Sequence, residues 1–150
     1  MRPLAISILA AALAACSPNP PRAVQPKADP VKEAWYGETV DQVAGMVREA
    51  ESSLSHGAAD QAAAIVTKGQ PLIHRLLSVP HPTLPAMQVV SDLDQIYGQM
   101  LLGNRHYVWA RVLFQKNVTR WTLWQPQTPD TLRRLKVARD AVAECDRHID

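Results

Sequence analysis

From residue 32 to the end of the chain, apolar residues recur at intervals of three and four. One such series is Val40, Val43, Val47, Ala50 and Leu54. This spacing places side chains on one face of an α-helix, which makes a turn in about 3.6 residues. No segment alternates apolar and polar residues convincingly enough to indicate a strand. The chain is therefore predicted to be all-α, without a sheet.

Glycine and proline residues divide the helical pattern into about five helices, stacked as antiparallel hairpins in a bundle or a short solenoid. The second helix contains Gly69 and Pro71, and we expect these residues to kink or split it. The predicted breaks between helices are Ser55-His56-Gly57, the connection with Pro80, Pro82 and Pro85, Gly103-Asn104, and the helix start Thr128-Pro129-Asp130.

The fourth predicted helix, at about residues 106–123, is apolar on more than one face. A helix with one solvated side would show a polar stripe, so this helix is expected to be central. The fifth helix carries a clean apolar stripe that includes Cys145. We therefore expect the Cys145 thiol to be buried and unreactive.

The N-terminus follows a different pattern. Arg2 precedes an apolar run over residues 4–15, which is shorter than the ~20 residues that a spanning helix needs. The tetrapeptide Leu13-Ala14-Ala15-Cys16 at the end of this run resembles the lipobox of bacterial lipoproteins. The resemblance implies that the chain is cleaved before Cys16, that the Cys16 thiol receives a diacylglyceryl group, and that the new amine is acylated.

These features predict three parts: a signal peptide at 1–15, a lipidated cysteine and proline-rich tether at 16–31, and a helical domain at 32–150. The tether contains five prolines, which favour extended polyproline II and reach up to ~45 Å. Ser17 follows the cysteine where lipoproteins retained at the inner membrane typically carry aspartate. The resemblance thus implies an outer-membrane anchor, with the domain facing the periplasm.

A faint internal repeat links two predicted hairpins. Tyr97-Gly98-x-x-Leu101 with Tyr107, Ala110 and Phe114 resembles the tetratricopeptide pattern of small and aromatic residues, and Gly57, Ala62 and Val66 echo part of it. In that family the small residues let paired helices approach closely. The pattern departs from the family because Asp94 stands where tryptophan is common, because no proline closes either unit, and because the units are about 48 residues apart rather than about 34.

Composition excludes several classes of function. The chain has 16 basic and 14 acidic residues, and cleavage before Cys16 would remove only Arg2, which leaves a nearly neutral protein. Bulk charge therefore argues against a nucleic-acid partner. Cys145 and His148 offer only two metal ligands, and no nucleophile or phosphate-loop motif is present. We expect no metal and no cofactor.

Charge is unevenly distributed. Residues 28–60 hold seven acids against two bases, whereas residues 105–139 hold eight bases against Asp130 alone. In one interpretation, basic and tryptophan side chains form a surface for an acidic envelope protein, an anionic envelope polymer such as a glycan, or a lipid headgroup. In the other, the acidic first helix packs beside the basic last two and the charges partly neutralise. The candidate surface comprises Arg105, Trp109, Arg111, Trp121, Trp124, Arg133 and Arg134.

Two functions remain open from the sequence. The first is a non-enzymatic envelope lipoprotein that holds or helps to assemble a partner, using arginine and tryptophan as interfaces do. The second is an enzyme, or its accessory subunit, that acts on an envelope polymer such as peptidoglycan. Asp92 and Asp94 are two residues apart and point to different helix faces, so they are interpreted as solvated carboxylates rather than an acid–base pair.

Overall fold

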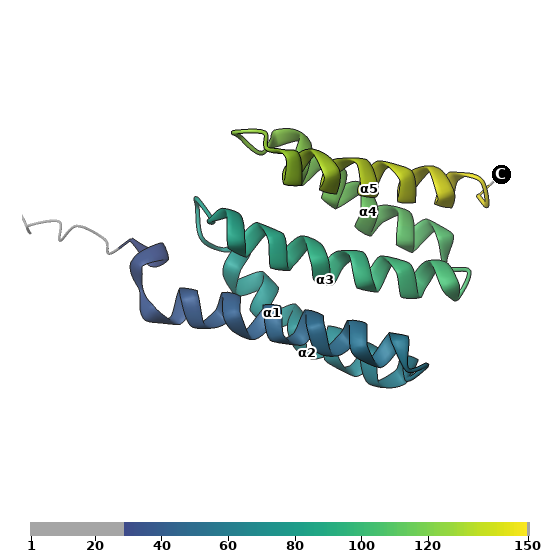
Figure 1. The fold of residues 1–150 in the computed structure, drawn as a ribbon, viewed down its shortest axis with the longest axis horizontal. Coiled ribbons are helices and arrows are strands. Elements are labelled where there is room, and N and C mark those ends of the chain that lie inside the picture. Colours follow the sequence, from purple (N-terminus) through teal and green to yellow (C-terminus); the bar gives the residue numbers. More distant parts are fainter. Residues whose placement is uncertain (1–28, 150) are drawn as a thin grey trace, which may run out of the picture.

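The computed structural model describes residues 29–149, and over this range the chain is all-α, as predicted (Figure 1). The elements are η1 Pro30–Lys32, a 3-10 turn, followed by α1 Ala34–Ser55, α2 Ala59–Leu77, α3 Leu84–Gly103, α4 Tyr107–Leu123 and α5 Pro129–Asp146. No strand occurs among these residues. The predicted signal peptide, Cys16 and most of the predicted tether lie outside the described residues.

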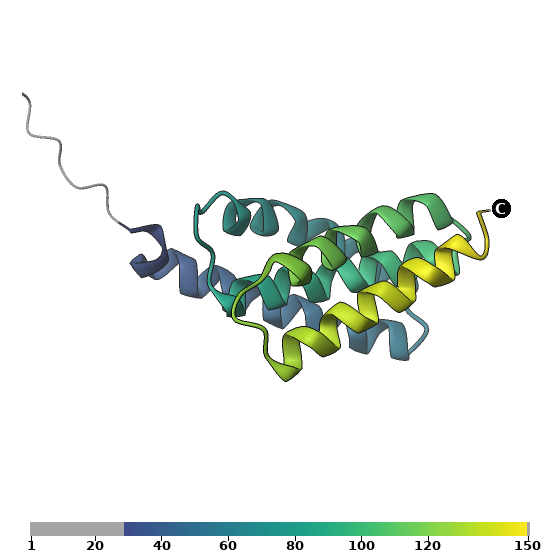
Figure 2. The ribbon, with the colours of Figure 1, turned by 90° about the horizontal axis from the view of Figure 1, so that it is seen from above.

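Successive helices are antiparallel. α1 pairs with α2, α4 pairs with α5, and α3 lies between these two pairs. The α1–α2 hairpin lies at the bottom of Figure 1, α3 crosses the middle, and α4 and α5 lie above it. α3 packs against α1, α2 and α4, whereas α5 packs mainly against α4. Seen from above, α4 and α5 run side by side over α3 (Figure 2). α3 is therefore the helix that joins the two halves of the molecule.

The α1–α2 and α3–α4 turns share one geometry. Each contains a residue with positive φ, Gly57 at 75° and Arg105 at 62°. In both turns this residue donates to the carbonyl three positions earlier, and the next residue donates to the carbonyl five positions before it. These bonds close a helix end in the usual left-handed cap, which glycine adopts freely and arginine only at a cost of about 1 kcal/mol.

The second connection is held by side chains. The Tyr36 hydroxyl of α1 accepts a hydrogen bond from the Thr83 backbone N–H at 2.8 Å, and Thr83 caps α3 through Ala86. At the start of α5, Thr128 and Thr131 form the reciprocal bonds of a capping box. The helix start predicted at Thr128 is therefore confirmed, and its cause is the satisfaction of otherwise unpaired N–H groups.

The main core joins α1, α2 and α3, and a smaller cluster forms where α4 meets α5 around Phe114 and Cys145. α3 and α4 approach closely at Gly98, where an added Cβ would lie 2.5 Å from the Phe114 ring. The small residue at 98 thus sets how near the two helices come, as the sequence pattern implied. The fully buried residues of the core include Val43, Ala50, Ala62, Leu76, Val90 and Leu93.

The second helix is not split at Pro71. α2 continues through this residue from Ala59 to Leu77. Proline lacks the N–H that would bond the carbonyl of Thr67, but both residues are exposed, so that carbonyl faces solvent. Buried Gly69 and Ile73 on the opposite face pack into the core and hold the helix together.

Candidate interaction surface

The structure does not bring the seven predicted surface residues together. Trp121 is fully buried, and its indole Nε1 donates to the Ser91 hydroxyl of α3 at 2.9 Å. Trp124 is half-buried and meets Trp121 edge to face, with ring centroids 6.5 Å apart. The prediction that Trp121 contributes to an exposed surface was therefore wrong. Its hydrogen bond across the helix interface explains why this aromatic side chain is internal.

A buried ion pair lies beside Trp121. Arg120 of α4 contacts Asp94 of α3 at 3.0 Å, and the two side chains are 7% and 8% exposed. Arg120 also donates to Asn117, whose amide donates to the Ser91 carbonyl at 3.0 Å. Burial raises the pKa of the Asp94 carboxyl, against the opposing attraction of Arg120. The interpretation of Asp94 as a solvated carboxylate was wrong, because α4 covers it.

Arg133 and Arg134 are also engaged within the molecule. Arg134 donates to Asp130 at 2.8 Å and to Asp92 of α3, and Arg133 donates to Asp130 at 2.6 Å. Hydrogen bonds from Arg133, Arg134 and Gln88 lower the pKa of Asp130 to about 2. Asp92 is thus also an ion-pair partner rather than a free helix-start carboxylate.

The expected pairing of an acidic first helix with the basic last two is not what neutralises the charge. α1 packs against α2 and α3. The bases of α4 and α5 instead pair with carboxylates of α3 and α5, because those are the helices they contact. The pairs are Arg120–Asp94, Arg134–Asp92, Arg111–Asp146 and Lys136–Asp140, together with the Asp130 contacts.

Arg105, Lys116 and Arg139 form no ion pair among residues 29–149. Arg105 lies in the α3–α4 turn, just before α4 begins, and Lys116 lies in the middle of α4. The charge available to a partner in the described chain is therefore smaller than the sequence count indicates, and part of it is concentrated near α4.

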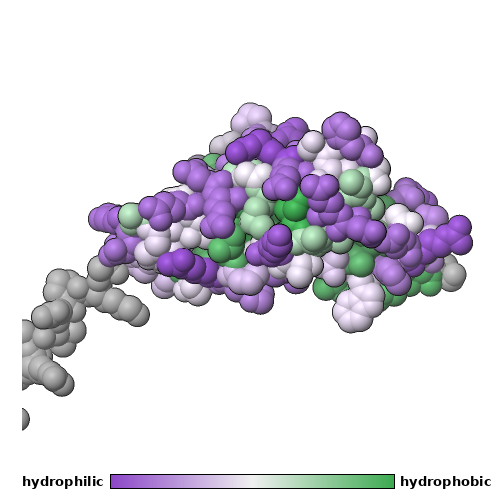
Figure 3. Space-filling view, turned by 90° about the horizontal axis from the view of Figure 1, so that it is seen from below, coloured by the Kyte–Doolittle hydropathy of each residue, from purple (hydrophilic) through white to green (hydrophobic). Residues whose placement is uncertain are grey.

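The side of α4 on which Lys116 lies also carries exposed apolar side chains. Trp109 is 67% exposed, Val108 59% and Val112 45%. The face seen from below, on the α1–α2 side of the molecule, is mostly hydrophilic, with small groups of hydrophobic residues near its middle and right-hand end (Figure 3). The prediction that α4 is central was wrong, because Val108, Trp109 and Val112 of this helix are exposed. α4 is apolar on several faces because it packs against α3 and α5 and also exposes an apolar stripe.

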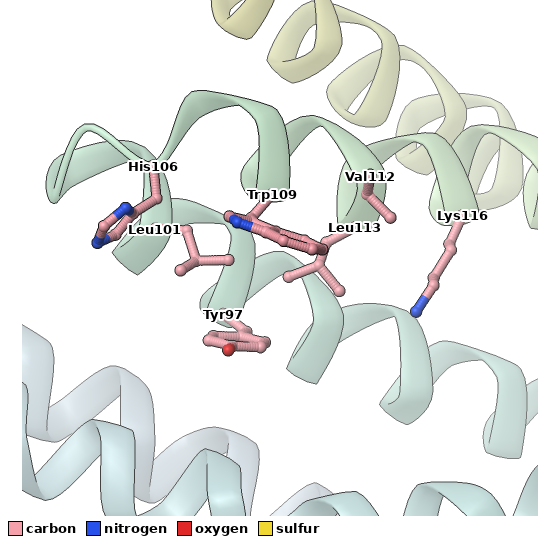
Figure 4. A pocket seen from close by; sticks show the side chains of 7 residues that line it. All are labelled: Tyr97, Leu101, His106, Trp109, Val112, Leu113 and Lys116. Carbon is pink, nitrogen blue, oxygen red and sulfur yellow. The ribbon is translucent and has the colours of Figure 1, made fainter.

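This stripe borders a hollow of about 410 Å³ between α3 and α4. Tyr97 and Leu101 rise from α3, and the Trp109 indole lies over them beside Leu113 (Figure 4). His106 stands at one end and the Lys116 ammonium at the other (Figure 4). We call this hollow, with its continuation described next, the apolar groove.

A second hollow of about 500 Å³ continues the first and shares Val112 and Lys116 with it. Leu77 at the end of α2 and Met87 of α3 supply its apolar lining. The whole groove is lined by Leu77, Met87, Tyr97, Leu101, His106, Trp109, Arg111, Val112, Leu113, Gln115, Lys116, Thr119 and Arg120. Of the predicted surface residues, only Trp109 and Arg111 belong to this lining.

The sequence contained a signal for this groove that was interpreted as burial. An apolar pattern around most of a helix predicts contact on several sides, but it does not say whether the contact is internal or with a partner. The residues of α3 that contribute, Tyr97 and Leu101, were assigned to a hairpin pattern. Their position beside Trp109 depends on how α3 and α4 cross, which periodicity does not specify.

A polar groove lies elsewhere along α3. One hollow of about 260 Å³ is lined by Glu51 and Leu54 of α1 and by Asp92, Gln95, Ile96 and Gln99 of α3. A neighbouring hollow toward α5 is lined by Asp92 and Gln95 together with Ser91, Asn117, Arg133, Arg134 and Val137. In the second hollow, the charged side chains Asp92, Arg133 and Arg134 are bonded to partners within the molecule, so their charge is used in internal contacts.

Cys145 is fully buried between α4 and α5, which confirms the predicted environment of its thiol. Desolvation, with a further contribution from Asp146, raises its pKa, so the reactive thiolate is disfavoured. His148 does not join it in a site but stacks on Tyr107 with ring centroids 4.5 Å apart. In the described residues, no three potential ligands among His, Cys, Asp and Glu are close enough to hold a metal ion.

No protein-family model matches the chain, and neither the curated proteins nor the solved structures contain a significant match. Within residues 29–149, no helix has the length and apolar character needed to cross a membrane.

Proposed function

We propose that this chain is a lipid-anchored protein of a bacterial envelope that holds or helps to assemble a partner protein and does not itself catalyse a reaction. The N-terminal support for the anchor is the sequence Leu13-Ala14-Ala15-Cys16 after a short apolar run. One acyl chain gives marginal membrane binding and two give stable anchoring, so a triacylated Cys16 holds the domain at a bilayer. Ser17 favours the outer membrane as the site of the anchor.

The observation that carries the interaction role is the apolar groove. Trp109, Val108 and Val112 are all exposed on one helix, and Tyr97 and Leu101 extend the apolar surface beneath them. Contiguous exposed apolar surface in a soluble domain marks a binding site, and tryptophan is the residue most enriched among energetically dominant contacts. Arg120, which lines the groove, is bonded to the neighbouring Asp94 carboxylate, and this pairing favours binding over catalysis.

The anchor is tested by replacing Cys16. We expect Cys16→Ser to leave the precursor uncleaved or the product unlipidated, as measured by intact mass and by detergent partitioning of the membrane fraction. Cys145→Ala is the matched control, because it removes the other cysteine and should leave lipidation unchanged. An unacylated natural product that begins at Met1 and stays inside the cell would overturn the anchor.

The interaction role is tested in the native envelope. A photo-crosslinking amino acid at Val112 should give a discrete adduct with one partner protein, identified by mass spectrometry. The same amino acid at Leu132, which is 52% exposed on α5 outside the groove, should give no such adduct. Equal labelling from both positions would show that the groove has no selective partner.

A further inference from the structure

The charges of the apolar groove specify its occupant more closely than its shape does. None of its lining residues in the described chain carries a carboxylate. Arg111 and Arg120 are held by Asp146 and Asp94, whereas Lys116 forms no ion pair with any residue from 29 to 149. Lys116 lines both hollows and therefore stands in the middle of the groove.

The length of the groove suits a helix. Its lining runs along α4 from His106, the N-cap, to Arg120, and it includes a row spaced by three or four residues: His106, Trp109, Val112, Lys116 and Thr119. At about 1.5 Å per residue this span is ~21 Å, which is the length of about 14 residues of α-helix. A row of this kind on one helix forms a ridge against which another helix packs.

We infer that the apolar groove binds an amphipathic α-helix of a partner protein, in which an apolar stripe is flanked by aspartate or glutamate residues. The inference rests on the proposed function and names the chemistry of the partner. In the complex, Trp109 and Val112 cover the apolar stripe, while the Lys116 ammonium pairs with an acidic side chain. Helices bind such grooves through residues at spacings of three, four and seven.

A second copy of this chain is a poorer occupant. Its acidic surface is α1, where Glu38, Asp41, Glu49 and Glu51 are exposed. Of the large apolar side chains that are exposed in residues 29–149, none belongs to α1. α1 therefore offers the right charge without the apolar stripe that the groove needs.

The test uses the full chain, purified in the processed form that its host makes, and two helix-stabilised peptides of about 14 residues. Both peptides carry the same leucine stripe, which is flanked by glutamates in one and by lysines in the other. Calorimetry should show binding of the glutamate peptide at least about tenfold tighter than of the lysine peptide. Equal affinity for the two peptides, or no binding of either, would overturn the inference.

Variants locate the binding on the groove. Trp109→Ser and Lys116→Glu should each weaken binding of the glutamate peptide by about tenfold or more. Leu132→Ser and Lys68→Glu are matched controls, because both residues are exposed and neither lines the groove. Thermal unfolding confirms that each variant is folded. Unchanged affinity in the Trp109 and Lys116 variants would place the binding elsewhere and contradict the inference.

The crosslinked partner provides an independent test. Peptide mapping of the Val112 adduct should locate the label in an acidic amphipathic helix of the captured protein. A label in a second copy of this chain, in a phospholipid or in a glycan strand would overturn the inference. Peptide binding does not depend on acylation, so failure of the Cys16 experiment would refute the anchor without changing this result.

Discussion

α3 contributes to two grooves that are lined in opposite ways. In the polar groove, Ser91 accepts from Trp121 of α4 and Asp92 accepts from Arg134 of α5, and the neighbouring Asp94 pairs with Arg120 of α4, so these polar groups have internal partners. In the apolar groove, Tyr97 and Leu101 lie beneath Trp109, and Lys116, which forms no ion pair among residues 29–149, stands at the other end of that hollow (Figure 4). Charged side chains that are paired within the fold contribute to its stability. The exposed apolar side chains and Lys116 have no such internal role and are available to a partner.

The largest effect is expected at the buried ion pair. Asp94→Ala should destabilise the protein by about 3–5 kcal/mol, because it leaves the Arg120 guanidinium buried without its carboxylate. Urea unfolding followed by circular dichroism measures the change. Adding Arg120→Met to this variant should recover much of the loss, since the buried charge is then gone. If Asp94→Ala alone were as stable as the wild type, the Asp94–Arg120 pair would not stabilise the fold, and the contrast between the two grooves would be contradicted.

A smaller effect is expected where α3 meets α4 beneath the groove. Gly98→Ala should cost about 2 kcal/mol, because the new methyl overlaps the Phe114 ring. Gly37→Ala is the matched control, since nothing lies within 4 Å of its added Cβ and alanine favours the helix. Thermal unfolding of the two variants should therefore shift in opposite directions. A shift in the same direction would show that α3 and α4 do not need this close approach.

Because of the ion pairs of Asp130 on α5, the free energy of unfolding should depend on pH in the acidic range. The pKa of Asp130 is about 2 in the folded protein, below its ordinary value, so stability from this group is present at neutral pH and falls as pH drops from about 4 toward 2. Asp130 is 39% exposed, and with solvent screening the contribution is about 1 kcal/mol. Urea titrations at several pH values should show this loss in the wild type and not in Asp130→Asn.

The smallest effect on stability is expected in the apolar groove. Trp109→Ser should change the free energy of unfolding by less than about 0.5 kcal/mol, because the indole is mostly exposed and no partner is present. Its effect should instead appear in partner binding. Destabilisation comparable to that of Gly98→Ala would mean that Trp109 belongs to the internal packing, and the distinction between the two grooves would fail.

The sequence predicted the helices well and their surroundings poorly, for a physical reason. Periodicity and caps are local, so the breaks at Gly57 and Thr128 could be predicted. The exposure of tryptophan depends on the crossing of helices. Trp109 and Trp121 are separated by 12 residues, which is about 120° around α4, so one faces solvent and the other faces α3.

Ion-pair partners show the same limit. The count of bases over residues 105–139 was correct, but five of the eight are bonded to carboxylates on α3 or α5. The sequence did not show that Asp92 would meet Arg134 or that Asp94 would meet Arg120, because residues 42 and 26 positions apart pair only after the helices have packed. Lys116 is one of the eight bases, and only the packed structure shows that it forms no ion pair among residues 29–149 while most of the other bases do.

The left-handed turn at Arg105 has a consequence for engineering this molecule. Glycine at this position would relieve the backbone and stabilise the α3–α4 turn, but it would also remove the positive side chain next to His106, which stands at one end of the apolar groove. At this one residue, a substitution that increases the stability of the turn therefore also lowers the positive charge near the groove.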